Sequence, residues 1–370
     1  MDALDLLRAL VAFPSLSHEE AEVAAFVEAE ARRAGLSVGR RDNNVYTWLG
    51  DGDDLLLLNS HLDVVPPSAD HPSPPFEPTL VDGQLYGRGT VDAKASGATM
   101  LSALFQLKAE GWAPPESGKV MVALTACEET GRGYNGLEDL RPHLPPVHAA
   151  LVGEPTDMQP CLAQKGLLIL RVEAHGQTAH AARAHLGDNA ILKAARDLQR
   201  IADFRFDRTD GFLGQPTVTP TVIEGGTARN VVPDRCAFYL DIRSTPAYTH
   251  DELIALFADA LESEVHVHSK RIIPVRTKAE SRIARACVNA IPKAQPFGSP
   301  TASDWMFLAD VPTVKIGPGF SERSHTPHEH IAVSDVERAV PLYKRIIQGY
   351  FQSENQFWET AEPPHLSSRA

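Results

Sequence analysis

Continuous apolar runs and a helical pattern alternate through the first 160 residues. Residues 55–59, 120–124 and 149–152 form runs without alternating polar positions, which is typical of strands that are buried on both faces. Residues 95–109, between the first two runs, carry apolar side chains at helical spacing. This order predicts an α/β domain in which helices cover both faces of a mainly parallel sheet.

Two sequences of the form Ser/Thr-x-x-Glu predict the starts of helices. Ser17 and Glu20 precede one apolar stripe with helical spacing, and Thr249 and Glu252 precede another. In such a capping box the hydroxyl and the carboxylate each accept a backbone N–H group of the first helical turn. We therefore expect both pairs to cap helices.

The hydrophobic pattern changes between residues 164 and 272. Apolar and polar residues alternate along 170–175 and 236–243, which is typical of strands with one face in water. Helical patterns at 191–202 and 253–261, together with strands near 217–224 and 264–271, complete the order βαββαβ. This order predicts a ferredoxin-like domain.

After residue 275 the earlier pattern resumes, with a helix expected at 282–290, a buried strand at 313–316 and a helix at 335–350. The small domain is therefore predicted to be inserted into the larger one. The predicted boundaries are 1–163 and 273–352 for the larger domain, 164–272 for the inserted domain and 353–370 for a polar tail.

Charge and cysteine content narrow the function classes. The net charge of −13 disfavours nucleic acid and anionic membranes as partners, because an acidic surface repels phosphate groups. The four cysteines lie far apart and form no C-x-x-C pair, so neither a disulfide framework nor a cysteine-rich zinc site is expected. With no signal-peptide pattern at the start, these features favour a cytoplasmic protein.

Five polar clusters follow predicted strands or loops of the larger domain. Taken singly, each has an ordinary explanation, such as a surface loop, a helix-capping aspartate or a chance group of histidines. Ligands of open parallel sheets bind beyond the carboxyl ends of the strands, so clusters at these positions also predict a site. The clusters span residues 60–63, 87–94, 128–129, 153–155 and 324–330.

Together the clusters indicate a metal centre. Imidazole and carboxylate groups without thiolate suit zinc, cobalt or manganese. There are enough carboxylates for two divalent metals and for one further group that acts as a base.

These motifs, in this order, resemble the M20 metallopeptidases and deacylases over residues 5–350. The resemblance implies a zinc-peptidase-like catalytic domain with an inserted ferredoxin-like domain that serves as a dimerisation domain and lid. It implies that Asp92 bridges two metals, that Glu128 is the general base and that Asp63 orients His61. The remaining implied metal ligands are His61 and Glu154 for one metal, and Glu129 and His325 for the other.

The resemblance also assigns roles in the inserted domain. His180, at the end of a Gly-x-x-x-His segment, would stabilise an oxyanion in the partner subunit of a homodimer. Asn230 and Arg243 would bind substrate. Arg243 lies on the polar face of its predicted strand and is expected to be free to bind a carboxylate with both of its outer nitrogens. Without the resemblance, His180 and Arg243 would be read as an ordinary exposed histidine and a solvated arginine.

Further stretches resemble the acetylornithine and succinylornithine deacylase branch, which implies hydrolysis of an N-acyl amino acid in arginine biosynthesis. Succinyl-diaminopimelate desuccinylase, aminoacylase and dipeptidase activities remain open, as do the acyl group and the native metal. A catalytically silent metal-binding scaffold is disfavoured because Glu128 and every expected ligand are present. The stretches are residues 152–160, 164–167, 175–183, 297–301 and 317–319.

Overall fold

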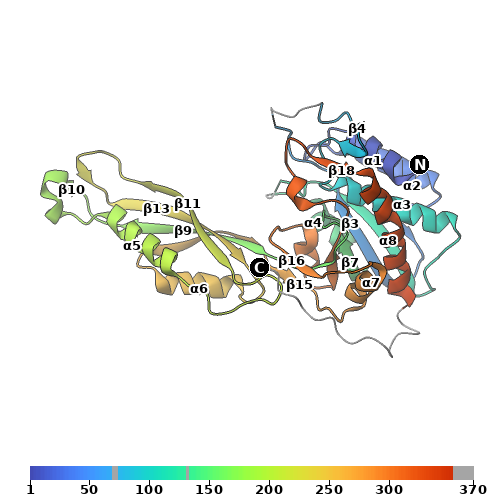
Figure 1. Ribbon diagram of the computed structural model, residues 1–370. Helices are drawn as coiled ribbons and strands as arrows, with labels where there is room; N and C mark the ends of the chain where they lie inside the picture. The colour runs from blue at the N-terminus through green and yellow to red at the C-terminus, as the bar shows by residue number, and fades with distance from the viewer. Residues whose placement is uncertain (69–73, 131–132, 353–370) are drawn as a thin grey trace. The chain divides into compact units, whose positions relative to one another are not determined.

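The computed structural model describes residues 1–68, 74–130 and 133–352. The chain forms two compact units, shown in Figure 1. Among the described residues, unit 1 comprises those of 1–162, 277–297 and 303–352, and unit 2 comprises 163–276 and 298–302. The predicted tail, residues 353–370, lies outside the described residues.

A mixed sheet forms the centre of unit 1. The strand order in unit 1 is β1-β2-β6-β3-β7-β17-β8. Strands β15 and β16 also pair with β8, and they lie wholly or mostly within the residue ranges of unit 2. The central strands β6, β3, β7 and β17 are mutually parallel, while the flanking pairs are antiparallel. The strands are β1 (Ser37–Arg41), β2 (Asn44–Leu49), β3 (Asp54–His61), β6 (Gly118–Thr125), β7 (Val147–Val152), β8 (Cys161–Gln164), β15 (Val275–Arg276), β16 (Phe297–Ser299) and β17 (Thr313–Lys315).

The predicted α/β sheet is confirmed. In β3 every residue from Leu55 to His61 is buried, as a strand covered on both faces requires. Helix α8 contacts α1, α3 and α7, and α3 and α7 in turn contact strands of the sheet. On the other strands, α2 contacts β1 and β2. The helices are α1 (Ala3–Val11), α2 (Ala21–Arg33), α3 (Lys94–Ala109), α4 (Gly136–Leu140), α7 (Arg282–Ala290) and α8 (Val333–Gln352).

Short elements complete unit 1. Strands β4 (Thr79–Val81), β5 (Gln84–Tyr86) and β18 (His330–Ala332) form a three-stranded antiparallel sheet, with β5 in the middle. This sheet connects the segment before α3 with the segment before α8. The 3-10 helices are η1 (Arg141–His143), η3 (Asp304–Leu308) and η4 (Ser321–Arg323).

Unit 2 has the predicted βαββαβ order. Its four-stranded antiparallel sheet has the order β11-β13-β9-β14. Alternate residues of β9 and β13 pack against α5 and α6 in one apolar core, which explains the period of two in the sequence. The elements are β9 (Gly166–His175), α5 (Ala190–Asp203), β11 (Thr217–Gly225), β13 (Arg235–Ser244), α6 (His250–Ala260) and β14 (Glu264–Ile272), with β10 (Ala179–His180), β12 (Val231–Val232) and the 3-10 helix η2 (Ala181–Leu186) as additions.

One of the two predicted capping boxes is confirmed and the other is wrong. Thr249 caps α6, and the carboxylate of Glu252 accepts the N–H group of Thr249. Helix α2 begins at Ala21 without a side-chain cap. The Ser17 hydroxyl instead donates to Asp63, and Glu20 is fully buried. Tertiary partners have therefore replaced the local ones at the start of α2.

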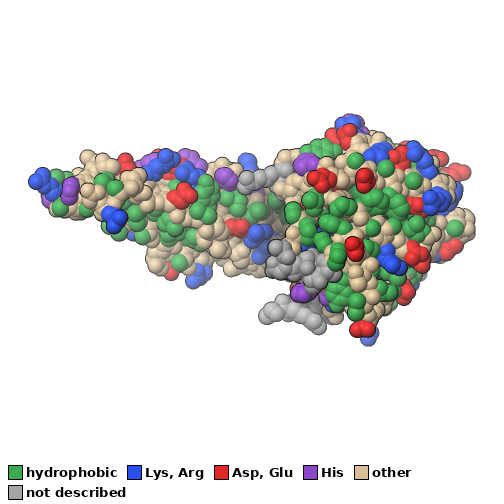
Figure 2. All heavy atoms as spheres, turned by 90° about the horizontal axis from the view of Figure 1, so that it is seen from above, with side chains coloured by type: hydrophobic (Ala, Val, Ile, Leu, Met, Phe, Trp, Pro, Cys, Tyr) green, Lys and Arg blue, Asp and Glu red, His purple; other side chains and the backbone are tan. Residues whose placement is uncertain are grey.

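Three further features bear on the sequence-based expectations. All four cysteines are free and buried. Within the described residues, no helix combines the length and the apolar composition that crossing a bilayer demands. In Figure 2, Lys and Arg side chains are scattered among Asp and Glu side chains on the visible face and do not gather into one basic patch.

Candidate metal centre

The candidate ligands lie where three parallel strands end. His61 is the last residue of β3, Glu128 and Glu129 follow β6, and Glu154 follows β7. Because these strands are parallel neighbours, their carboxyl ends share one edge of the sheet. Asp92, just before α3, completes this part of the site.

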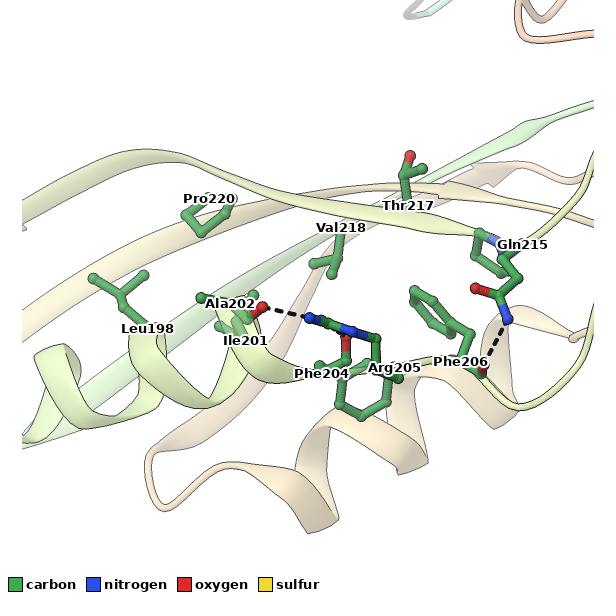
Figure 3. A pocket seen from close by; sticks show the side chains of 11 residues that line it. Leu198, Ile201, Ala202, Phe204, Arg205, Phe206, Gln215, Thr217, Val218 and Pro220 are labelled. Atoms are coloured by element: carbon green, nitrogen blue, oxygen red, sulfur yellow. Dashed lines mark hydrogen bonds between the residues drawn. The ribbon is translucent and has the colours of Figure 1, made fainter. Parts of the chain in front are cut away.

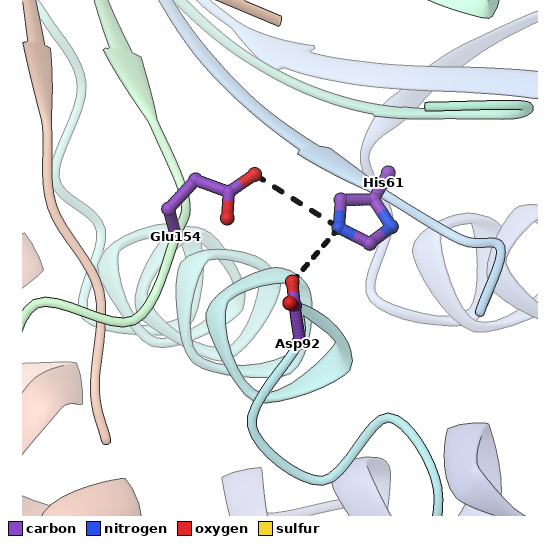
Figure 4. Close-up of side chains that lie close together, drawn as sticks. All are labelled: His61, Asp92 and Glu154. Carbon is purple, nitrogen blue, oxygen red and sulfur yellow. Dashed lines mark hydrogen bonds and ion pairs between the residues drawn. The ribbon is translucent and has the colours of Figure 1, made fainter. Parts of the chain in front are cut away.

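His61, Asp92 and Glu154 form a first group that can hold a metal ion (Figure 4). The Nε2 atom of His61 lies 3.3 Å from Oδ1 of Asp92 and 3.9 Å from Oε1 of Glu154. The His61 side chain is only 2% exposed. The sequence-predicted ligands of one metal are therefore side by side.

Asp92, Glu129 and His325 form a second group. The Nε2 atom of His325 lies 3.3 Å from Oδ2 of Asp92 and 2.9 Å from Oε1 of Glu129. Asp92 thus turns Oδ1 towards His61 and Oδ2 towards His325. A carboxylate that faces two ligand groups with its two oxygens has the geometry that a bridging ligand needs.

Glu128 belongs to a third overlapping group, with His61 and Glu129. Burial raises the pKa of Glu128 well above its ordinary value; the His61 imidazole opposes this rise, and the Glu154 and Asp304 carboxylates increase it. Glu128 therefore holds a proton more readily than an exposed glutamate, a property that suits a general base.

The metal-free centre concentrates charge in a buried place. Burial raises the pKa of Glu154 to about 8, with the neighbouring Asp92 carboxylate as a further cause. Hydrogen bonds to Asp92 and Glu129 raise the pKa of His325 to about 10. A divalent cation relieves both effects, because it replaces protons on the imidazoles and neutralises the clustered carboxylates. Imidazole and carboxylate donors without thiolate thus fit zinc, cobalt or manganese.

Asp63 supports the centre in two ways. Its main-chain carbonyl lies 2.8 Å from Nδ1 of His61, whereas its carboxylate lies 3.5 Å away, so the carbonyl is the nearer partner. Its carboxylate oxygens accept the N–H groups of Glu128 and Glu129, both at 3.0 Å. Asp63 therefore holds the turn after β6 as well as the His61 ring.

Asp92 has a support that the sequence analysis missed. The Glu329 carboxylate accepts the N–H groups of Val91 and Asp92, at 2.9 and 3.1 Å, and pairs with Arg88 at 2.6 Å. Arg88 and Glu329 are both buried. Each lies in a polar cluster that the sequence had singled out, so the signal was present, but only the fold shows that the two residues meet.

The three candidate residues of the inserted domain lie in unit 2. His180 and Asn230 come together: His180 pairs in register with Val231, and the Asn230 carbonyl accepts the Ala181 N–H group at 2.9 Å. Both side chains are exposed. The expectation that Arg243 is free is wrong, because its guanidinium donates to both carboxylate oxygens of Asp241, at 2.9 and 3.2 Å.

Unit 2 also carries a pocket of about 320 Å³ beside α5 and β11 (Figure 3). Its wall is largely apolar, and its long polar side chains, Arg205 and Gln215, donate to backbone carbonyls of Ala202, Phe204 and Phe206. The pocket shows none of the acidic and imidazole chemistry of the centre in unit 1.

Comparison with known proteins agrees with this geometry. The model of peptidase family M20/M25/M40 matches residues 57–349. The succinyl-diaminopimelate desuccinylase of Wolbachia pipientis wMel is 26% identical, in an alignment that covers 96% of this chain and 95% of the relative.

Two solved structures share the fold. Aminopeptidase PepT from Bacillus cereus is 23% identical with a TM-score of 0.78, over 94% of this chain and 98% of the other. A dinuclear metal-binding peptidase of the M20 family from Bacillus subtilis is 14% identical with a TM-score of 0.73, over 96% and 98% of the two chains.

Proposed function

The chain belongs to peptidase family M20/M25/M40, as a metal-dependent hydrolase of amide bonds, and from this premise we propose that it uses two divalent metals to remove the acyl group of an N-acyl amino acid, with N-acetyl- or N-succinyl-L-ornithine as the leading substrate. The observation that carries the two-metal proposal is the position of Asp92, whose two oxygens face two separate ligand groups. The dinuclear metal-binding relative from Bacillus subtilis supports it.

The proposal assigns metal binding and proton transfer to separate residues of the chain. His61 and Glu154 would hold one metal, Glu129 and His325 the other, and Asp92 both. When bound, such cations polarise a carbonyl group and lower the pKa of water. Glu128 takes the proton of the attacking water and then delivers it to the leaving amine. Its place beside His61 and Glu129, among the candidate ligands, suits both steps.

Arg243 is proposed to bind the carboxylate of the substrate. Its present partner, Asp241, is a poor competitor, because ion pairs at exposed sites contribute only about 0–1 kcal/mol, and the Arg243 side chain is 44% exposed. A substrate carboxylate can therefore replace Asp241 and bind both outer nitrogens of the guanidinium.

His180 is proposed to stabilise the developing oxyanion. Its Nδ1 atom accepts the Ala182 N–H group at 3.1 Å, so the neutral ring carries its proton on Nε2. An exposed Nε2–H group of fixed orientation is a suitable oxyanion donor.

Strand β13 separates these two functions. His180 and Asn230 lie near Arg235, at the start of β13, whereas Arg243 lies near its end. At about 3.3 Å per residue, the eight steps along the strand from Arg235 to Arg243 span roughly 26 Å. A small substrate held by Arg243 therefore cannot reach His180 of the same chain, which supports the proposal that a homodimer completes each site.

Subunit mixing tests the homodimer. Glu128→Gln and His180→Ala homodimers are each expected to be nearly inactive. After exchange, half of the dimers are mixed, and each mixed dimer has one site with both residues, so about a quarter of the wild-type activity should return. If exchange is demonstrated by mass spectrometry and no activity returns, His180 does not act across subunits.

The substrate assignment rests on sequence stretches that resemble ornithine deacylases. A second candidate, N-succinyl-diaminopimelate, is favoured by the relative from Wolbachia pipientis. Both substrates present an amide, a carboxylate and a distal amine, so the metal centre does not distinguish them.

Amine release by zinc- or cobalt-loaded protein distinguishes them. The panel comprises N-acetyl-L-ornithine, N-succinyl-L-ornithine, N-succinyl-diaminopimelate, N-acetyl-L-methionine and a dipeptide, with EDTA controls. We expect an ornithine derivative to lead by tenfold or more in kcat/KM, which corresponds to about 1.4 kcal/mol. A lead for the diaminopimelate derivative would establish the second candidate. Metal binding without hydrolysis of any amide would leave a silent scaffold.

A further inference from the structure

Glu20 is a fully buried carboxylate with an unusual set of partners. Its Oε1 atom accepts the N–H groups of His18, at 2.9 Å, and of Cys127, at 3.1 Å. The Cys127 thiol lies 3.3 Å from the same oxygen, and Asn43 donates to Oε2 at 3.1 Å. Glu20 therefore connects the segment before α2 and the β1–β2 turn to the turn after β6.

The turn after β6 carries two carboxylates of the proposed centre: Glu128, the proposed base, and Glu129, a proposed metal ligand. Its N–H groups at Cys127, Glu128 and Glu129 are all accepted by buried carboxylates: the first by Glu20 and the other two by Asp63. Two acidic side chains thus hold three consecutive peptide groups. Removing either acceptor leaves part of the turn without its partner.

The backbone at Cys127 needs this support. Its φ angle is 59°, in the left-handed region that residues other than glycine rarely adopt. Such a conformation persists where the surrounding structure holds it in place. The Glu20 carboxylate contacts both the N–H group and the thiol of this residue.

We propose that Glu20 is a positioning residue for the reaction: by fixing the Cys127 turn, it sets where the side chains of Glu128 and Glu129 lie. This inference rests on the proposed function, in which Glu128 is the base and Glu129 is a metal ligand. Glu20 touches neither metal nor substrate and acts through the backbone. Support of this kind is known to change metal affinity or activity by about 10–100-fold.

Three substitutions separate the reach of the carboxylate from its charge. Glu20→Ala removes the acceptor. Glu20→Asp keeps the charge but retracts the oxygens by about 1.5 Å, so the Cys127 N–H group loses its partner. Glu20→Gln keeps an acceptor oxygen at the same reach and, after rotation of the Asn43 amide, a donor for Asn43. Glu30→Gln is a matched control, because Glu30 is another buried acid, within α2, and pairs with Arg33.

The experiment titrates metal-free protein with Co²⁺ in a calorimeter and measures amide hydrolysis by the loaded protein. We expect Glu20→Ala and Glu20→Asp to weaken the second Co²⁺ by about 10–100-fold and to lower kcat by a similar factor, with KM changed less than threefold. Glu20→Gln and Glu30→Gln should stay within threefold of wild type. Circular dichroism and Tm report whether each variant folds, and Glu20→Asp decides the question if Glu20→Ala does not.

Folded Glu20→Asp protein with wild-type Co²⁺ affinity and wild-type kcat would overturn the inference. So would a Glu20→Gln variant as defective as Glu20→Ala, because the geometry of the acceptor would then not be the cause. If wild-type protein binds two Co²⁺ ions but hydrolyses no acyl amino acid, the proposed function fails, while the Co²⁺ affinities still decide the role of Glu20.

Discussion

The acidic side chains at the centre in unit 1 have different partners from the ion-paired acids of unit 2. In unit 2, carboxylates lie against guanidinium groups: Glu173 pairs with Arg235 at 2.7 Å, and Glu252 pairs with Arg208 at 2.7 Å. At the centre in unit 1, the nearest charged partners of Asp92 and Glu129 are imidazoles, and the other neighbours are further carboxylates.

The difference shows where a cation is needed. Carboxylates paired with arginine are electrically satisfied within the protein, whereas burial and the neighbouring Asp92 carboxylate raise the pKa of Glu154 to about 8. We therefore propose that the reactive chemistry lies in unit 1 and that unit 2 presents side chains that bind and orient the substrate. Substitutions in each unit, metal removal and pH test this division.

Removing the proposed base should cause the largest loss. Glu128→Gln keeps the size of the side chain but cannot take a proton, so kcat should fall by about 10²–10⁴-fold, with metal content and Tm unchanged. Glu252→Gln, which alters a paired acid of unit 2, should stay within about twofold of wild type. Steady-state kinetics and metal analysis provide the measurement; near-native turnover of Glu128→Gln would rule out its role as base.

Ligand substitutions should remove metals in a pattern set by the shared aspartate. His61→Ala should leave about one metal per chain, because His61 is proposed to hold only one of the two metals, whereas Asp92→Asn should weaken both sites. Metal content after dialysis measures this. Two tightly held metals in either variant would contradict the ligand assignment.

Metal removal should affect the two units unequally. A ligand present at a hundred times its Kd stabilises the folded state by about 2.7 kcal/mol, so EDTA should lower the Tm of the unit that holds the metals. In hydrogen exchange, amides of β3 and β6 should lose protection, while those of β9 and β13 should not. Equal loss in both units would mean that the metals lie elsewhere.

Arg243→Ala should raise KM more than it lowers kcat. A hydrogen bond to a charged group contributes about 1.5–3 kcal/mol, which corresponds to roughly 10–100-fold in KM. Arg235→Ala provides the comparison, because Arg235 lies on the same strand and pairs with Glu173. If the two variants have the same KM, Arg243 does not bind substrate.

The smallest of the expected effects is a weak pH dependence of the stability of unit 2, caused by a buried histidine. Burial lowers the pKa of His250, whose Nδ1 atom donates to the Lys270 carbonyl at 3.1 Å and whose Nε2 atom lies 2.8 Å from the Ser244 hydroxyl. The unfolded chain binds a proton near pH 6.5 while the folded ring is still neutral. Unit 2 should therefore lose stability as the pH falls below about 6.5, by at most about 1.4 kcal/mol per pH unit.

The His250→Gln variant should lose this slope. Protection of amides in α6 and β14 against hydrogen exchange, compared at pH 5.5 and 7.5, provides the measurement. If wild-type and variant protein show the same change in protection between the two pH values, the titration of His250 does not contribute to the stability of unit 2.

The two predicted capping boxes show how far local sequence reasoning extends. At Thr249 and Glu252 the partners are three residues apart, so the sequence itself contains the whole interaction. At Ser17 and Glu20 the same letters mislead, because Asp63 and Cys127 lie 46 and 107 residues away and compete for those side chains. The long-range hydrogen bonds form there in place of the capping box, because a buried carboxylate such as Asp63 or Glu20 requires hydrogen bonds.

From the sequence alone we could predict most of the longer helices and strands of both units and the chemical types in the proposed centre, but not short strands such as β4, β5 and β18. Apolar periodicity is local, because it follows from the geometry of a helix or a strand, and the polar clusters lie at the ends of the strands that it predicts. The tertiary structure was needed to show that the two oxygens of Asp92 face different groups, that Glu329 accepts the Asp92 N–H group and Glu20 the Cys127 N–H group, and that Arg243 pairs with Asp241. These are contacts between side chains, whose partners depend on distances that the periodicity of a sequence does not contain.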